Sequence, residues 1–104
     1  MGITAVTTWE CTPASLPVLV EGSREAAPLH ESMGAKNARL LRDSHGSNTV
    51  AHYALDFDSH EAYGAFIDAM RAHEWWSQLE AAVAEAHPNV LLKGTTVYYD
   101  VLSG

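Results

Sequence analysis

The sequence has few of the residues that mark a secreted, membrane-bound or nucleic-acid-binding protein. Its single cysteine, Cys11, allows no disulfide within the chain. Lys and Arg number 6 against 13 Asp and Glu, so the formal net charge is -7 and no basic cluster could neutralise phosphates or anionic lipids. No apolar stretch approaches the roughly 20 residues of a spanning helix, and Thr7, Thr8 and Glu10 interrupt any apolar leader. We therefore expect a cytoplasmic protein that binds neither nucleic acid nor membrane.

Motifs with a defined chemistry are also scarce. The 6 histidines show neither the H-x-x-x-H nor the H-E-x-x-H spacing of a metal site. No serine lies in a G-x-S-x-G context, and the chain has no glycine-rich phosphate loop and no dinucleotide fingerprint. Cys11 has no neighbouring base in the sequence, which favours buried packing over reactivity. The sequence therefore predicts no metal site and indicates no nucleophile.

The apolar residues that are present make up 47% of the 104 positions, which is enough for a core in one small domain over residues 1–104. Alternating apolar and polar types predict strands, whereas apolar residues recurring every three or four positions predict helices. The predicted elements are a strand at 2–11, a helix at 14–33, a strand at 36–44, a turn at 45–48, a strand at 49–57, a helix starting at 58–59 with its stripe reaching 70, a further short helix after 73, and a strand at 90–102.

A few residues refine the expected shape of these elements. Pro28 predicts a kink or an interruption in the first helix, because proline cannot donate a backbone hydrogen bond. Gly34 predicts the end of that helix, and Gly94 predicts a bend in the last strand. Asp58 and Ser59 are both residue types that cap a helix N-terminus, and Asp58 with Glu61 has the spacing of a capping box at the start of the second long helix.

The order strand, helix, strand, strand, helix, short helix, strand is the split β-α-β arrangement of a ferredoxin-like α+β protein. It predicts a four-stranded antiparallel sheet with the helices on one face. The strands carry Leu, Val and Tyr on both faces, so the uncovered face would expose an apolar patch to water. We therefore predict a homodimer in which the two sheets face each other.

His30 is the first candidate for a functional residue. The helix at 14–33 has Leu16, Leu19 and Ala27 on its inner side, and His30 falls on the same side near the helix end. A histidine there could act as a general base, as a haem ligand or as a hydrogen-bond anchor for a ligand. The alternative is a partly exposed histidine stabilised by the helix dipole.

His52 is the second candidate for a catalytic residue. It lies beside Tyr53 in the strand at 49–57, so the two side chains point to opposite faces of the sheet. One should face the helices and the other the dimer seam. The neighbours on both faces are apolar, so either residue could be the one that faces the helices.

Several large side chains could line a pocket or could simply pack in the core. Trp76 fits the apolar stripe of the third helix, whereas Trp75 lies off that stripe and could close a pocket mouth or touch a partner chain. Tyr98 and Tyr99 alternate in the last strand, so one of them faces each way. The residues predicted to line a substrate pocket are Trp9, Tyr53, Phe66, Met70, Trp75 and Tyr98.

The chain resembles the dimeric α+β barrel superfamily, which includes antibiotic-biosynthesis-type monooxygenases and NIPSNAP-like proteins. The segments that carry the resemblance are TTWECTP at 7–13, LHESMGAKNARLLR at 29–42, HGSN at 45–48, DSHEAYGAFIDAM at 58–70 and EWWSQL at 74–79. The resemblance implies a pocket in each protomer between the helices and the sheet. Superfamily members use that pocket for cofactor-free oxidation, haem degradation, cyclisation or isomerisation, so the fold does not choose among them.

The function we predict is a small dimeric pocket protein that binds a hydrophobic or aromatic small molecule. It could be a cofactor-independent monooxygenase, cyclase or isomerase. His30 and His52 would then be the catalytic polar groups of an otherwise apolar pocket. One alternative is a haem-binding or haem-degrading protein that uses either histidine as an axial ligand. The other is a ligand-binding or structural dimer without turnover.

Overall fold

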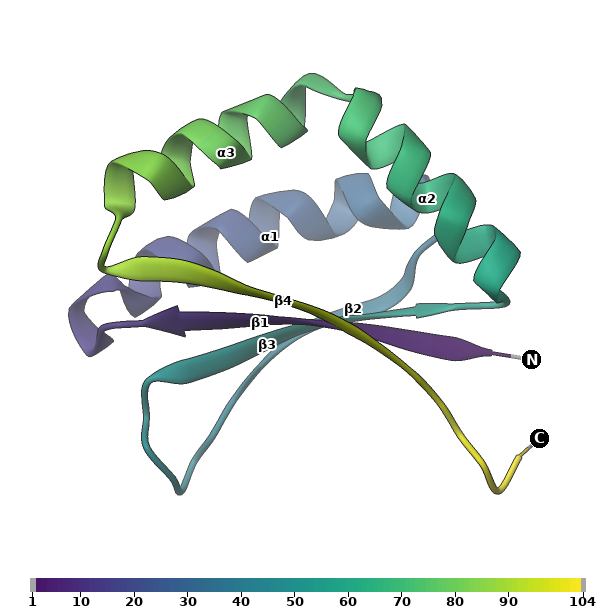
Figure 1. Ribbon diagram of the computed structural model, residues 1–104, viewed down its shortest axis with the longest axis horizontal. Helices are drawn as coiled ribbons and strands as arrows, with labels where there is room; N and C mark the ends of the chain where they lie inside the picture. Colours follow the sequence, from purple (N-terminus) through teal and green to yellow (C-terminus); the bar gives the residue numbers. More distant parts are fainter. Residues whose placement is uncertain (1, 104) are drawn as a thin grey trace.

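The computed structural model describes residues 2–103, which form a sheet covered by helices on one side (Figure 1). The strands pair in the order β2-β3-β1-β4, and each neighbouring pair is antiparallel. This arrangement confirms the predicted ferredoxin-like α+β class. The elements are β1 (Ile3–Cys11), the short 3-10 helix η1 (Pro13–Ser15), α1 (Leu16–Ser32), β2 (Lys36–Arg42), β3 (Val50–Phe57), α2 (His60–Ala72), α3 (Glu74–Ala86) and β4 (Val90–Tyr99).

Alternation along the two central strands separates a buried face from an open one. The residues that pack beneath the helices are Ile3, Ala5, Trp9 and Cys11 in β1 and Ala51, Tyr53, Leu55 and Phe57 in β3. They pack with Leu19 of α1 and with Phe66 and Met70 of α2. Cys11 is a buried free thiol, as its sequence context predicted. The opposite face carries the intervening residues, including Thr4, Thr8 and His52, and no helix among residues 2–103 covers it (Figure 1).

The helix ends follow local chemistry, with two departures from prediction. Gly34, at a φ of +104°, follows α1 in a conformation that glycine adopts without steric strain. The capping-box prediction was wrong: Ser59 caps α2 by accepting a hydrogen bond from the Ala62 amide, whereas Asp58 pairs with Lys36 at 2.8 Å. α1 also runs without interruption through Pro28, because packing of its inner face outweighs one missing hydrogen bond.

The last strand is bent, as Gly94 predicted. The register between β1 and β4 shifts at Thr8/Trp9, and Gly94 lies opposite Thr8 with a φ of +131°. Beyond this point β4 curves away from the helices (Figure 1), and its residues are exposed up to its end at Tyr99, three residues before the predicted end. Among the described residues, no helix combines the length and the apolar character needed to cross a membrane.

Candidate functional site

Two adjoining cavities lie between the helices and the sheet, each with a volume of about 300 Å³. The first lies between α1 and α3 and opens at exposed residues such as Val18, Glu25 and Gln78. The second lies beneath α2 and the start of α3 and opens beside β4 at Leu92 and Thr95. The residues that line both cavities, and so form a shared wall, are Trp9, His30, Tyr53, Trp75 and Leu79.

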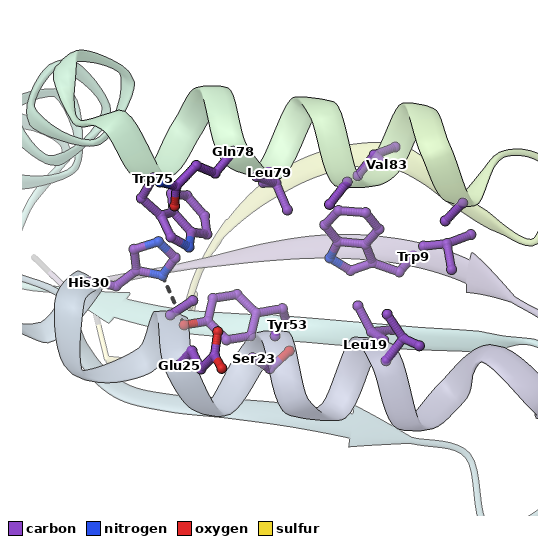
Figure 2. Close-up of a pocket in the computed structure, with 16 residues that line it drawn as sticks. Trp9, Leu19, Ser23, Glu25, His30, Tyr53, Trp75, Gln78, Leu79 and Val83 are labelled. Atoms are coloured by element: carbon purple, nitrogen blue, oxygen red, sulfur yellow. Dashed lines mark hydrogen bonds between the residues drawn. The ribbon is translucent and has the colours of Figure 1, made fainter.

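His30 is the polar centre of this shared wall. The last turns of α1 hold its ring against the sheet, where only 3% of the residue is exposed. Its Nδ1 forms a 2.9 Å hydrogen bond with the hydroxyl of Tyr53, drawn as a dashed line in Figure 2. Trp75 packs perpendicular to the imidazole at a centroid distance of 4.5 Å, and Phe66 does so at 5.3 Å. These edge contacts fix the orientation of the ring.

Both members of the His30–Tyr53 pair are uncharged near neutral pH. Burial lowers the pKa of His30 to about 4, because a charged imidazolium is poorly solvated in this apolar setting. Burial, with a smaller contribution from the negative charge of Glu31, raises the pKa of the Tyr53 hydroxyl well above its ordinary value. The hydrogen bond therefore joins a neutral imidazole to a neutral phenol, and either group can be its donor.

The second ring nitrogen of His30, Nε2, is buried and has no hydrogen-bond partner among the described residues. Figure 2 shows this nitrogen on the side of the ring that faces Trp75, away from Tyr53. A buried polar atom without a partner destabilises a fold by about 1–3 kcal/mol. Trp75 borders both cavities, so its indole has free space into which it could shift. Such a shift would uncover Nε2 to a molecule in either cavity.

The structure brings six of the eight predicted site residues together. Trp9, His30, Tyr53 and Trp75 form most of the shared wall, and Phe66 and Met70 line the second cavity. Trp75 thus belongs to the pocket even though it lies off the apolar stripe of α3.

His52 and Tyr98 lie elsewhere, and their predicted pocket positions need correction. His52 is on the open face of the sheet, where its Nδ1 lies 3.1 Å from the Thr8 hydroxyl, because Tyr53 takes the helix-facing position. Tyr98 is paired with Thr4 in the sheet, faces the same open side, and is 55% exposed. Neither residue lines the two cavities under the helices.

Some lining residues were not predicted as site residues. Leu79 lies in the apolar stripe of α3, and its periodicity indicates a core position without showing that a cavity adjoins it. Arg71 and Thr95 line the second cavity, but they are isolated polar residues in a helix and a strand, and no sequence motif marks them. Among residues 2–103, no three His, Cys, Asp or Glu side chains come together in a way that could hold a metal ion.

The fold and these cavities place the chain in a recognisable structural class, although its sequence is distant from other proteins. Neither a protein-family model nor a curated protein matches the sequence. Solved structures do match it, at 11–17% identity. At this level of identity the likeness shows a shared fold and no more.

Three of these structures illustrate the class. A dimeric ferredoxin-like protein from an uncultured marine organism superposes with a TM-score of 0.74 at 11% identity, covering 96% of this chain and 95% of that one. An antibiotic biosynthesis monooxygenase-like protein from Deinococcus radiodurans gives 0.69 at 17% identity, covering 96% and 92%. An uncharacterized NIPSNAP domain protein from Burkholderia xenovorans gives 0.67 at 12% identity, covering 95% and 92%. The resemblance drawn from the sequence is confirmed at the level of the fold.

Proposed function

We propose that this protein binds a hydrophobic or aromatic small molecule in the two cavities and anchors it through Nε2 of His30. The observation that carries the proposal is a buried, unpartnered imidazole nitrogen in the wall between two largely apolar cavities. A ligand with an apolar body and one hydrogen-bonding group would fill the space and satisfy that nitrogen. Trp75 would have to move aside, which the free volume on both sides of it permits.

The electrostatics of His30 favour binding over proton transfer. A general base works best when its pKa lies near the working pH, whereas burial holds His30 at about 4. The neutral imidazole can nevertheless accept a hydrogen bond from a ligand hydroxyl, or donate one to a ligand carbonyl, according to its tautomer. We therefore place ligand binding first and cofactor-free oxygenase, cyclase or isomerase activity second.

The haem alternative fits this arrangement less well. A ligating histidine commonly has its other nitrogen hydrogen-bonded, and the Tyr53 hydroxyl at Nδ1 meets that requirement. The Nε2 that would hold the iron is buried beneath Trp75, however, and neither cavity gives it an open coordination position. A haem would therefore have to displace more of the wall than a planar ligand that hydrogen-bonds to the same atom.

We also propose that two copies associate through the open sheet face. This face carries exposed apolar side chains, among them Leu41 at 50% and Tyr98 at 55% exposure, that a second sheet would cover. One of the matched structures is described as a dimeric ferredoxin-like protein. In such a dimer the cavities would remain on the outer, helix-covered side of each protomer.

Calorimetric titration with 2-naphthol and with naphthalene tests the anchor. The wild-type protein should bind 2-naphthol about tenfold more tightly than naphthalene, because only the hydroxyl pairs with Nε2, a gain of about 1.4 kcal/mol. His30→Leu should remove the preference while retaining naphthalene binding. His52→Leu is the matched control and should keep the preference for 2-naphthol.

Three results would contradict these proposals or replace them. Failure of the wild type to bind either compound contradicts the proposed function. If His30→Leu keeps the wild-type preference for 2-naphthol over naphthalene, His30 is not the anchor. A Soret band on adding haemin that His30→Leu abolishes and His52→Leu retains would move the assignment to haem binding.

A further inference from the structure

The second cavity contains a charged group that the binding proposal does not use. Arg71, in the last turn of α2, is the charged side chain that lines it, and no aspartate or glutamate does so. The first cavity has the opposite character, with Glu25 as its charged lining residue. The two cavities therefore share the wall around His30 but are lined by side chains of opposite charge.

Arg71 is held in place without being neutralised. Its guanidinium carbon lies 5.9 Å from the ring centroid of Trp76, a cation–π distance, and Trp76 also lines the second cavity. The chain has 6 basic residues, and among residues 2–103 the ion pairs engage Arg24, Lys36, Arg39 and Arg42. Arg71 is thus unpaired, although acidic residues outnumber basic ones by 13 to 6.

A second donor lines the same cavity. The hydroxyls of Thr7 and Thr95 lie 2.8 Å apart, so one donates its hydrogen to the other. The hydroxyl that accepts this bond keeps its own hydrogen, which is free to donate to a ligand. The second cavity therefore offers hydrogen-bond donors, an unpaired cation and no acidic group.

From this distribution we infer that the second cavity selects amphipathic anions, with an apolar aromatic body between α2 and the sheet and a carboxylate or sulfonate at Arg71. This inference rests on the proposed function and names the ligand class. The net charge of -7 does not prevent it, because salt screens charges beyond about 8–10 Å and the group in contact dominates. The planar guanidinium of Arg71, within cation–π distance of Trp76, can pair with such a group through two parallel hydrogen bonds.

Two probes that share one ring system test the inference. 8-Anilinonaphthalene-1-sulfonate carries an anion, and N-phenyl-1-naphthylamine is the same scaffold without it. In fluorescence titrations of the full chain, Arg71→Gln should weaken sulfonate binding about fivefold, the size expected for a partly exposed ion pair. Binding of the neutral probe should change less than about twofold, because the apolar body is unaltered.

Lys93 supplies the matched control, since it is also a basic residue without an ion pair among residues 2–103 but lines neither cavity. Lys93→Gln should leave the affinity for both probes unchanged, and the Arg71→Gln loss should shrink as salt rises. Equal losses of both probes in Arg71→Gln, or no loss of either, would overturn the inference while leaving the binding proposal intact. Failure of the wild type to bind the neutral probe would instead count against the binding proposal itself.

Discussion

The two faces of the sheet give neighbouring residues of one strand different surroundings. Tyr53 points under the helices, where it is buried and hydrogen-bonded to His30. His52 points to the open face, where it contacts a threonine hydroxyl beside water. Burial lowers the pKa of His30, the histidine that α1 places under the helices. Position under the helices, rather than residue type, therefore decides which histidine belongs to the candidate site.

On the open face, the carboxylate of Asp56 has its hydrogen-bond partners close by. Burial alone would raise the pKa of Asp56, but hydrogen bonds from Thr4, Asn37 and Arg39, with the charge of Arg39, hold it below its ordinary value. The helix-covered face instead leaves Nε2 of His30 without a partner. A buried polar atom without a partner beside a cavity indicates where a ligand would gain a hydrogen bond.

The largest difference between the faces should appear when an aromatic ring is removed from each. Phe66→Ala should lower the free energy of unfolding by about 3–5 kcal/mol, because it empties a core position under the helices. Tyr98→Ala on the open face should lower it by less than about 1 kcal/mol in the monomer. Urea unfolding at low protein concentration measures both. Comparable losses would mean that the open face is also a core of the single chain.

Acid should expose the same contrast through His30. The pKa of His30 is 6.5 in the unfolded chain and about 4 in the folded protein. Between pH 6.5 and pH 4, His30 is therefore protonated in the unfolded chain but not in the folded protein. Wild-type stability, compared with His30→Leu, should therefore fall by about 3 kcal/mol as pH drops from 7 to 4, and should not change above pH 7. His52→Leu should retain this dependence. The measurement is the free energy of unfolding of the wild type and of His30→Leu at several pH values. A difference between them that does not change with pH would mean that the His30 ring is solvated.

Removing one hydroxyl from each face gives a finer test. Tyr53→Phe leaves Nδ1 of His30 without its bond, in addition to the unpaired Nε2, and should lower the free energy of unfolding by about 1–3 kcal/mol. Thr8→Val removes the corresponding contact to His52 and should change it by less than about 0.5 kcal/mol, since water can replace the hydroxyl. Thermal melts of both variants at pH 7 provide the comparison, and the reverse ranking would refute it.

A charge placed on the open face should change the free energy of unfolding least and the affinity between two copies strongly. Leu41→Lys on the open face should change the unfolding free energy of the monomer by less than about 0.5 kcal/mol, because the side chain is half exposed. In sedimentation experiments it should weaken dimerisation at least tenfold, because covering the lysine with a second sheet would take its charge out of water. Val18→Lys places the same charge at an exposed position on α1, and this control should leave association unchanged.

The sequence was sufficient to predict the order of elements, because strand alternation, helical stripes and the glycine turns agree with one another. It also placed His30 on the inner face of α1, since that position follows the apolar period. It could not assign His52 and Tyr53 to faces, because both sets of neighbours are apolar and parity depends on which side the helices cover. The sequence offered both Asp58 and Ser59 as caps, and it could not show that Lys36, 22 positions away, pairs with Asp58 and that Ser59 is the cap.

The family resemblance predicted a pocket between the helices and the sheet, but the shape of that space and its division into two cavities could not be predicted from the residues. A cavity is space that packing leaves unfilled, and it depends on how three helices sit over a twisted sheet rather than on any local pattern. Periodicity assigned Trp76 to the core and left Trp75 open, yet both line a cavity. No sequence motif marks Arg71, and a lone arginine in the last turn of a helix is sufficiently explained by the helix dipole. Its position over Trp76 becomes informative only with the fold in view.

The placement of the tryptophans makes the protein its own optical sensor. The chain has 3 of them, and each one borders at least one of the two cavities. Indole emission shifts in wavelength and intensity with the polarity of its surroundings, so the native ultraviolet signal originates at the walls where a guest molecule would lie. Occupancy could thus be followed without any label, and Trp76→Phe or Trp75→Phe would show from which compartment the signal arises.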